Sequence, residues 1–420
     1  MCWTHVDLLT RPGGVVVSVH VAPVTSSTIV VAVDVGKTSA LLSVTDAGHH
    51  RLFGPSEFAM NRTGLAAVLA RVATSVPLSG QVKVGVEAAG HYHRPVLDHR
   101  WPDGWEVLEL NPAHVAEQRR VQGRRRIKTD VIDLEAITEL VLAGHGSPVT
   151  DRDVVIGEIS AWAVHRSRRV ATRTATKNQL LGQLDRAFPG LTLALPDVLG
   201  TKIGRLVAAE FADPTRLAGL GVNRLIRFAA TRDLQLRRPV AERLVAAARD
   251  ALPTRDAVIA RRILAADLAL LADLDDQIQS AETALGSLLP RSPYATLTSV
   301  PGWAVVRVSN YAAALGDPKR WPGPRQIYRA SGLSPMQYES AHKRRDGGIS
   351  REGSVALRRA LIDLGIGLWL NEPAAKTYAH GLKDRGKHSG VVACALAHRA
   401  NRIAYALVRD HATYEAARWA

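Results

Sequence analysis

Two short apolar runs in the first third of the chain each end at a carboxylic acid, and this pattern constrains the fold more than any other. The run 29–33 ends at Asp34, and the run 82–86 ends at Glu87. Short valine-rich runs bounded by turn residues are typical of buried strands. The two runs therefore predict buried strands of one sheet, with an acid where each strand ends.

A second pair of acids opens a predicted helix. Asp130 and Asp133 follow Thr129, and a spacing of three residues puts both carboxylates on one helical face. Helix N-termini favour negative charge, which alone accounts for many such acids. Two strand-end acids beside this pair are nevertheless suited to hold one or two Mg²⁺ ions, because hard cations take carboxylate oxygens. Such ions stabilise the attacking and leaving oxygens of a phosphodiester displacement.

The order of elements from residue 28 to 150 predicts an α/β domain. Predicted strands are 29–33, 40–45, 51–53, 82–86 and 105–110, and predicted helices are 63–76, 93–99, one from about 112 and the one with the acid pair. Three strands followed by alternating helices and strands predict a mixed five-stranded sheet with helices on its faces. This order matches the ribonuclease H-like architecture.

Two long helices are predicted beyond this domain. One runs from about Val154 to Phe188, and the other runs from Ala257 to Leu289. A heptad seam in the second helix consists of Leu264, Leu271, Leu274, Ile278, Ala281, Leu285 and Leu288. We predict a coiled-coil arm that serves dimerisation or guide binding, with packing inside one chain as the alternative. Shorter helices are predicted at 203–211 and 240–251.

These patterns give four predicted regions. They are a disordered N-terminal extension (1–27), the α/β domain (28–150), a helical coiled-coil region (151–290) and a mainly helical C-terminal domain (291–420). In the last region, residues 299–304 are similar to a helix–hairpin–helix turn, whose backbone N–H groups approach a DNA phosphate. Ala304 stands where that motif commonly has its second glycine, so a plain helical turn is the alternative.

The charge balance favours a polyanionic partner. The chain has 54 Lys and Arg against 39 Asp and Glu, a formal net charge of +15. A charge of this size favours fast, salt-sensitive association with nucleic acid, although a ribosomal or nucleoid-like protein could be as basic. Cys2 and Cys394 are the two cysteines, which excludes a disulfide framework and zinc-motif spacing and favours a reducing compartment. No apolar run reaches the roughly 18 residues of a membrane helix.

Two basic segments lie near candidate reactive groups. The first follows the fifth predicted strand and consists of Arg119, Arg120, Arg124, Arg125, Arg126 and Lys128. It is suited to hold phosphates against the acids, or it is a solvated charge run. The second, at 330–361, places serines among arginines on a predicted glycine-rich loop. A serine hydroxyl is a poor nucleophile unless its proton is removed or its charge is stabilised, and most loop serines are structural.

The chain resembles DEDD-type insertion-sequence transposases, of the group described as bridge-RNA-guided recombinases, over roughly residues 28–410. Each marker is weak alone, but the ordered set is specific. The markers are Val33-Asp34-Val35-Gly36-Lys37, Glu87, Lys128-Thr129-Asp130 with Asp133, Val300-Pro301-Gly302, Ser331-Gly332-Leu333-Ser334-Pro335, Glu339-Ser340, Gly348-Ile349-Ser350-Arg351-Glu352-Gly353 and Leu357-Arg358.

The resemblance implies a transposase or recombinase that inserts and excises a mobile element. Its first domain would be similar to the Holliday-junction resolvase RuvC and would bind Mg²⁺ through Asp34, Glu87, Asp130 and Asp133. Its last domain would supply a nucleophile at Ser340. Donor and target DNA would be read by pairing with a structured bridge RNA. A composite active site shared between subunits implies a homo-oligomer, a dimer or a tetramer, in the bacterial cytoplasm at the nucleoid.

The serine segment departs from the family pattern at one position. Ala341 follows Ser340, where a glycine is usual. The alternative nucleophiles are Ser334, Ser350 and Ser354. Plausible phosphate clamps around the serine are Arg344, Arg345, Arg351 and Arg358.

Three other functions remain open from the sequence. A metal-only nuclease or junction resolvase would hydrolyse DNA with water and needs no serine. A non-catalytic nucleic-acid-binding protein would not need the four acids. A sugar-kinase-like ATPase would share the sheet, but the +15 charge and the lack of a glycine-rich adenosine loop disfavour it.

Overall fold

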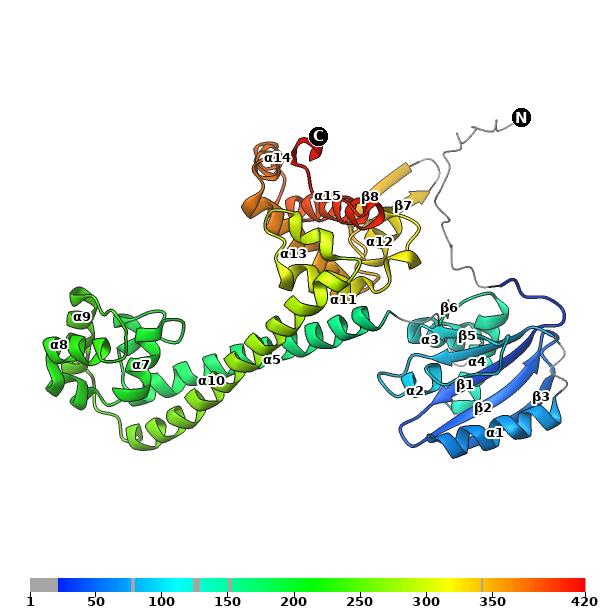
Figure 1. The fold of residues 1–420 in the computed structure, drawn as a ribbon, viewed down its shortest axis with the longest axis horizontal. Coiled ribbons are helices and arrows are strands. Elements are labelled where there is room, and N and C mark those ends of the chain that lie inside the picture. The colour runs from blue at the N-terminus through cyan, green and yellow to red at the C-terminus, as the bar shows by residue number, and fades with distance from the viewer. Residues whose placement is uncertain (1–21, 77–79, 124–128, 150–152, 341–342, 420) are drawn as a thin grey trace. The chain divides into compact units, whose positions relative to one another are not determined.

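The computed structural model describes residues 22–76, 80–123, 129–149, 153–340 and 343–419. The chain divides between residues 152 and 153 into two compact units (Figure 1). We refer to them as unit 1 and unit 2. Among the helices of the described ranges, none is both long and apolar enough to cross a membrane.

Unit 1 is built on a six-stranded mixed sheet of order β3-β2-β1-β4-β5-β6. The strands are β1 (Ile29–Val35), β2 (Ser39–Asp46), β3 (Arg51–Ala59), β4 (Val82–Glu87), β5 (Glu106–Leu110) and β6 (Ser147–Pro148). Strand β1 pairs antiparallel with β2 and parallel with β4, and β4 pairs parallel with β5. The predicted mixed sheet is therefore present, but β6 adds a sixth strand to the predicted five. A two-residue strand carries no apolar alternation that a sequence could reveal.

The edge strand β3 is longer than predicted. It continues from Phe53 to Ala59, and its second half alternates between exposed Glu57 and buried Phe58. Only one side of β3 pairs with a neighbour, so Pro55, which has no N–H to donate, is tolerated there. Because this half of the strand contains exposed polar residues and Pro55, it has no continuous apolar run, and the sequence pattern did not predict it.

Helices cover both faces of the sheet (Figure 1). The helices of unit 1 are α1 (Arg62–Ser75), α2 (Arg94–Leu97), α3 (Pro112–Val121) and α4 (Asp130–Leu142). Successive side chains of a strand point to opposite faces. Val31 and Val33 of β1 pack in the cluster that includes α1, whereas Val30 and Ala32 pack in the cluster that includes α4.

Residues 22–27, which the sequence assigned to a disordered extension, lie along this sheet. The N–H of Ala22 donates to Glu106 Oε1 at 3.1 Å, and the carbonyl of Ala22 accepts from Lys83. The Lys83 side chain is fully buried, and its Nζ lies 2.8 Å from Glu106 Oε2. A buried ammonium needs such partners, so this ion pair fixes the described end of the segment.

Unit 2 is helical, apart from one two-stranded hairpin, within its described residues. Its helices are α5 (Val154–Ala187), α6 (Leu191–Ala194), α7 (Lys202–Glu210), α8 (Pro214–Ala230), α9 (Arg238–Arg249), α10 (Ala257–Leu288), α11 (Val305–Leu315), α12 (Pro324–Ala330), α13 (Val355–Asn371), α14 (Pro373–Asp384) and α15 (Ser389–Asp410). Short 3₁₀ helices are η1 (Leu289–Arg291), η2 (Ala295–Ser299), η3 (Pro318–Arg320) and η4 (Ala416–Trp419), and the hairpin strands are β7 (Pro335–Ser340) and β8 (Lys343–Ile349).

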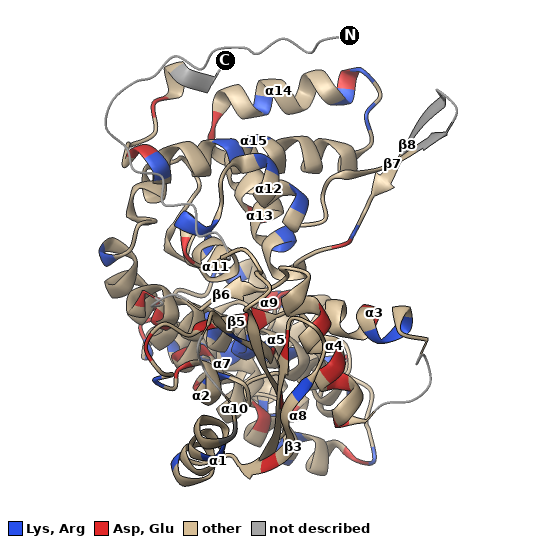
Figure 2. Ribbon diagram, turned by 90° about the vertical axis from the view of Figure 1, so that its right-hand side faces the viewer, with Lys and Arg blue, Asp and Glu red and all other residues tan. Residues whose placement is uncertain are grey.

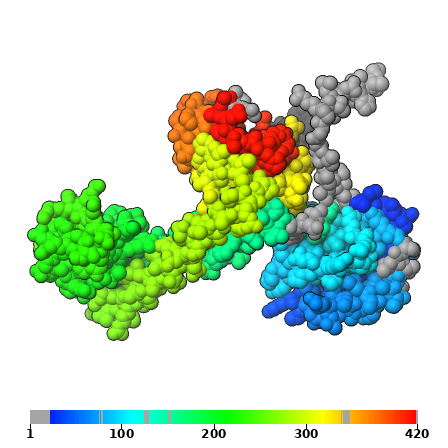
Figure 3. All heavy atoms as spheres, in the orientation of Figure 1, coloured from blue at the N-terminus to red at the C-terminus, as the bar shows by residue number. Residues whose placement is uncertain are grey.

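The long helices α5 and α10 lie side by side and run antiparallel, and we call them the helix pair (Figure 3). Ion pairs join Arg166 to Glu282 at 2.7 Å and Arg173 to Asp275 at 3.0 Å, so residue numbers rise along one helix as they fall along the other. Every residue of the predicted heptad seam in α10 is buried. The seam is therefore the packing face of α10, and the ion pairs beside it set the register.

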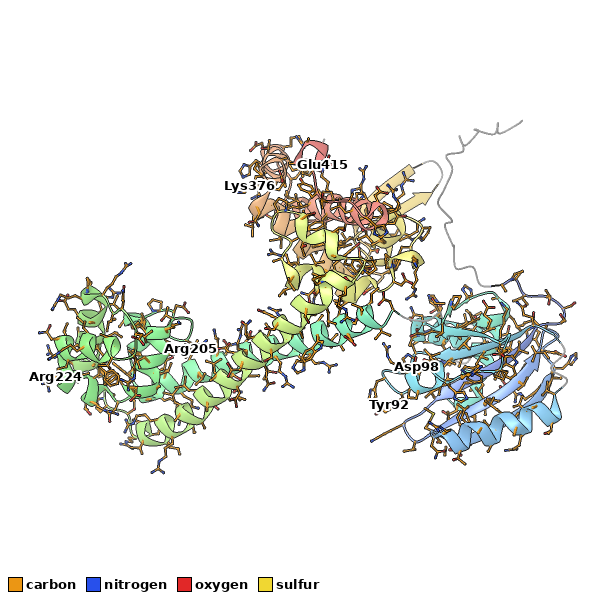
Figure 4. All side chains as sticks on the ribbon, viewed as in Figure 1. Tyr92, Asp98, Arg205, Arg224, Lys376 and Glu415 are labelled. Carbon is orange, nitrogen blue, oxygen red and sulfur yellow. The ribbon has the colours of Figure 1, made fainter. Side chains whose placement is uncertain are left out.

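Each end of the helix pair enters its own hydrophobic core. At one end, α6–α9 pack on Leu180, Leu184 and Leu264, and we call this the tip bundle. At the other end, α11–α15 form the C-terminal bundle around Trp303. Figure 4 marks Arg205 where the tip bundle meets the helix pair, and its Nη1 lies 2.5 Å from Asp275 Oδ2.

Helix α8 of the tip bundle was not predicted. It bends at Gly221, whose φ of 72° and ψ of 170° interrupt the helix. Gly219, Gly221 and Pro214 read as loop residues in the sequence, whereas Pro214 opens the helix at its first turn, where proline is tolerated.

Candidate functional site

Asp34 and Glu87 occupy neighbouring strand ends in the middle of the sheet of unit 1. In the parallel pairing of β1 with β4, Val33 lies opposite Val86. Asp34 and Glu87 are the next residue on each strand, so they stand side by side, and both are half-buried. The backbone pairing of two central strands thus brings together the two acids that the sequence placed at strand ends.

Both acids lie on the sheet face that α4 covers. Side chains alternate along a strand, so Asp34 follows the parity of Val30 and Ala32, which pack in the α4 cluster. Glu87 has the parity of Gly85, opposite to that of Val84 and Val86. Helix α4 carries the other two acids of the predicted quartet, which we call the acid set: Asp34, Glu87, Asp130 and Asp133.

Gly85 lets α4 approach this face closely. A Cβ built on Gly85 would lie 2.6 Å from Val141 Cγ2 and 2.9 Å from Ile137 Cγ2. Ile137 and Val141 continue the helical stripe that begins at Asp133, at spacings of four residues. The close contact at Gly85 therefore brings the face of α4 that carries Asp133 against the sheet. A glycine inside a valine strand signals such an approach, but the sequence does not reveal its partner.

The two acids of α4 differ in environment. Asp130 is exposed in the first turn, whereas Asp133 is buried. Thr129 caps the helix by accepting a hydrogen bond from the Ile132 N–H at 3.4 Å. Asp133 Oδ1 lies 2.9 Å from Arg119 Nη1 of α3. The sequence predicted Arg119 as a phosphate ligand, but here it neutralises a buried member of the acid set.

The donors of the acid set fit a divalent cation, although they do not form a metal cluster in this structure. Within the described ranges, no group of three or more His, Cys, Asp and Glu side chains is arranged to hold a metal ion. Carboxylate oxygens are the ligands that Mg²⁺ takes in proteins. A metal bound by Asp133 would compete with the Arg119 guanidinium for this carboxylate.

The basic segment beside the acid set is only partly described. Arg120 is exposed, and its Nη1 lies 2.6 Å from Glu117 of the same helix. The remaining predicted residues, Arg124, Arg125, Arg126 and Lys128, lie outside the described residues.

Ser340 is the last residue of β7 at the turn of the hairpin. The strands pair antiparallel, with Ser340 opposite Lys343 and Glu339 opposite Arg344. The sequence predicted a glycine-rich loop here, whereas the backbone forms two paired strands with Gly347 and Gly348 inside β8. The side chains of Ser340, Arg344 and Arg345 lie outside the described part of the chain.

Two of the alternative serines have structural roles. Ser354 caps α13 by accepting a hydrogen bond from the Leu357 N–H at 3.2 Å. Ser350 Oγ accepts from the Glu352 N–H at 3.3 Å. Ser334 is half-buried, and its carbonyl accepts from the Ser350 N–H at 2.9 Å.

Two of the predicted phosphate clamps, Arg351 and Arg358, have described side chains, and these differ in solvent exposure. Arg358 donates from Nη1 to the Ser331 carbonyl at 3.1 Å and is half-buried. Arg351 is exposed, with a φ of 58°. Arg358 therefore supports the base of the hairpin, and Arg351 is the more accessible of the two.

The turn similar to a helix–hairpin–helix packs into the C-terminal bundle. Gly302 has a φ of 80°, and a Cβ there would lie 2.3 Å from the Gly367 carbonyl oxygen of α13. Trp303 is buried and donates from Nε1 to the Leu364 carbonyl at 2.9 Å. A 3₁₀ helix, η2, precedes the turn where the motif has an α-helix. Gly302 is thus needed for packing on α13.

Two family models match the chain, one in each part that carries predicted site residues. A DEDD transposase model of the IS110 type, described as a transposase, matches residues 31–189 and includes the acid set. A model described as the transposase IS116/IS110/IS902 family matches residues 294–380 and includes Ser340.

Three curated relatives are similar over parts of the chain. The insertion element IS110 uncharacterized 43.6 kDa protein of Streptomyces coelicolor is 24% identical over 63% of this chain and 65% of its own length. The transposase for insertion sequence element IS1328 of Yersinia enterocolitica is 34% identical over 31% of this chain and 41% of its own. The insertion element IS900 uncharacterized 42 kDa protein of Mycobacterium paratuberculosis is 25% identical over 72% of this chain and 76% of its own length. The chain thus covers less than two thirds of the first two.

Proposed function

Because this chain belongs to the IS116/IS110/IS902 family of DEDD-type transposases, we propose that it cuts and rejoins DNA to insert and excise a mobile element. The observation that carries the proposal is the side-by-side position of Asp34 and Glu87, each one residue beyond the paired Val33 and Val86, on the sheet face covered by α4. That arrangement supplies carboxylates where a phosphodiester displacement needs them.

The acid set would hold Mg²⁺. When bound, the metal would stabilise negative charge on the scissile phosphate. Asp34 and Glu87 are held by strand pairing, and Asp133 is held by the packing of α4. Arg119, which contacts Asp133 at 2.9 Å, would compete with the metal for this carboxylate and would bind a phosphate where the metal displaces it.

Ser340 would be the nucleophile. Its Oγ attacks the scissile phosphorus, a phosphoserine bond forms, and the DNA hydroxyl that leaves takes up a proton. A free DNA hydroxyl later attacks the same phosphorus and returns the serine, so bond energy is conserved. We place Arg344, Arg345 and Arg351 as phosphate ligands during these steps, with Arg358 supporting the loop beneath them.

For the guide RNA and the number of subunits, we propose what the resemblance to the family implies. A structured bridge RNA would select donor and target DNA by base pairing, and the protein would bind shape and backbone. The helix pair would act as a coiled-coil arm that contacts RNA or another subunit. Two or four copies would unite the acids of one subunit with the serine of another. The sites of action would be the cytoplasm and nucleoid of a bacterium.

The test is a covalent trap in cells that carry the native locus. We would isolate the protein under denaturing conditions and measure DNA that stays attached, comparing wild type with Ser340→Ala and with Ser334→Ala as the matched control. An adduct lost only in Ser340→Ala supports the proposal. An adduct that persists in Ser340→Ala moves the nucleophile elsewhere. Mg²⁺-dependent nicking with no adduct in any variant would favour a resolvase-like nuclease.

A further inference from the structure

A basic cavity lies between α12 and α15 of the C-terminal bundle. It has a volume of about 460 Å³ and is lined by Pro324, Arg325, His398 and Arg402. Three of these four residues carry basic side chains, and no carboxylate is among them. Helices α12 and α15 pack on each other, and Figure 2 shows basic positions along both.

The basic groups converge from two helices. His398 and Arg402 are four residues apart on α15, so they lie on one face. Arg325 is the second residue of α12 and approaches from the opposite wall. Arg402 and Arg325 are exposed, so their guanidinium groups are accessible to a ligand at the mouth of the cavity.

Three hydrogen bonds hold the walls together. The Asn401 side chain is buried and donates from Nδ2 to the Pro324 carbonyl at 2.6 Å. The Tyr405 hydroxyl donates to the Pro322 carbonyl at 3.0 Å, and the Tyr328 hydroxyl donates to the Cys394 carbonyl at 3.1 Å. Burial raises the pKa of Tyr328, which keeps that hydroxyl protonated as a donor. The two helices that carry the basic groups are thus held together before any ligand arrives, which lowers the entropy cost of binding.

In the described part of the chain, no carboxylate lines this cavity, although Arg402 also lines a neighbouring cavity that contains Asp410 and Glu415. Within the described residues, neither Arg325 nor Arg402 forms an ion pair, whereas Arg409 of the same helix lies 2.7 Å from Asp410. Partial burial, followed by the charges of Arg402 and Arg399, lowers the pKa of His398. The ring of Tyr328 lies edge-on to the His398 ring, with 4.9 Å between the two ring centroids. Like charges held together without a carboxylate favour an anionic ligand.

We propose that this cavity binds a phosphate group of nucleic acid, with Arg325 and Arg402 as charged ligands and His398 as a further hydrogen-bond donor. Guanidinium groups suit this ligand because their planar N–H pairs match two phosphate oxygens. The proposal rests on the proposed function, which supplies the nucleic acid. It adds a contact outside the acid set and outside the serine hairpin.

The test measures nucleic-acid binding by the full chain at several salt concentrations. A fluorescently labelled DNA duplex and a labelled single-stranded RNA are the probes, and the variants are Arg325→Gln, Arg402→Gln and the matched control Arg409→Gln. We expect each cavity variant to weaken binding about tenfold to at least one probe and to reduce the slope of log affinity against log salt by about one. Arg409→Gln should bind like wild type. Cavity variants indistinguishable from Arg409→Gln would overturn the proposal.

A thermal melt identifies the source of the phosphate. Inorganic phosphate, compared with chloride at equal ionic strength, should protect wild type and not Arg402→Gln if a free or terminal phosphate group suffices. Absence of protection, with the loss of probe binding described above, would assign the site to the phosphodiester backbone. If phosphate does not protect wild type and the cavity variants also keep their affinity for both probes, the proposal is wrong.

The same melts separate binding from folding. Removing one of several like charges should leave the melting temperature of Arg402→Gln equal to or above that of wild type. A lower melting temperature would give this arginine a structural role instead. Strand cleavage is measured separately, so wild type that binds through the cavity without cleaving DNA would contradict the proposed function and leave this inference intact.

Discussion

Unit 1 and unit 2 position their predicted reactive groups by different means. Asp34 and Glu87 lie near the C-terminal ends of two central strands, β1 and β4, which have a neighbour on both sides, so the sheet fixes the backbone of both acids. Ser340 ends one strand of a hairpin whose two strands pair only with each other, and an isolated two-stranded hairpin is marginally stable by itself. The fold of unit 1 therefore fixes where Asp34 and Glu87 lie, whereas the position of Ser340 depends on what its hairpin contacts.

The largest expected effect tests the acid side of this comparison. Asp34→Asn and Glu87→Gln each remove a carboxylate from the acid set, so we expect DNA strand cleavage to fall about a thousandfold or more. Gel analysis of a labelled DNA substrate measures it. The control is Glu109→Gln on β5, which pairs with Val86 and therefore has the opposite parity to Glu87. Cleavage should stay near wild type in the control, and retained cleavage in Asp34→Asn would refute the assignment.

The second-largest expected effect, on the free energy of unfolding, tests whether the seam of α10 holds the helix pair together. Leu274→Ala empties a buried seam position of α10 and should lower the free energy of unfolding by about 2–5 kcal/mol. Leu270→Ala, four residues earlier and 44% exposed, should change it by no more than about 0.5 kcal/mol. Urea denaturation followed by circular dichroism checks both. Equal losses in the two variants would mean that the seam is not the packing face.

A smaller effect contrasts a glycine of each unit. Gly85→Ala places a methyl group against Ile137 and Val141 and should destabilise unit 1 by about 1–3 kcal/mol through overpacking. Gly182→Ala in α5 meets nothing within 4 Å and should stabilise by up to about 1 kcal/mol. Urea denaturation reports both signs. A neutral Gly85→Ala would show that α4 does not need this close approach.

The smallest effect concerns the ion pairs of the helix pair. Burial would raise the pKa of Asp275, but hydrogen bonds and charge from Arg205 and Arg173 lower it overall from 3.8. A lowered folded-state pKa gives stability that is present above the unfolded pKa and is lost as pH falls through the folded value. Asp275→Asn should therefore cost about 0.5–1 kcal/mol at neutral pH.

The cost of Asp275→Asn should shrink as pH falls below 3.8, which urea melts at a series of pH values would measure. Asp276→Asn, next to it and exposed, is the control and should match wild type throughout. A difference between Asp275→Asn and wild type that persists undiminished at low pH would contradict the ion-pair explanation.

The sequence predicted features that depend on periodicity and missed those that depend on contacts. Strands β1 and β4 and the buried seam of α10 follow from apolar runs and heptads, because burial selects those residues directly. Strand β3 beyond Phe53 and the kinked α8 escaped because Pro55, Pro214 and Gly221 read as loop residues. Strand β8 is mostly polar, and β7 alternates only at Met336 and Tyr338, which is too short a pattern to predict a strand.

The candidate site shows the same division. The sequence placed Asp34 and Glu87 at strand ends, and the strand pairing sets them side by side. No pattern could reveal that Gly85 seats α4, because the partners Ile137 and Val141 lie more than fifty positions away in the chain. The ion pair of Arg119 with Asp133 was likewise invisible, since a basic run gives no sign of which member turns inward.

The tip bundle has a consequence for how chains of this kind can vary. Arg186 near the end of α5 pairs with Asp256 just before α10, so the chain leaves and re-enters the helix pair at one place. The first family model ends at residue 189 and the second begins at 294. Helix α5, with 34 residues, spans about 50 Å. Adding or removing whole heptads in both α5 and α10 would therefore change the distance between the tip bundle and the C-terminal bundle without rebuilding either core.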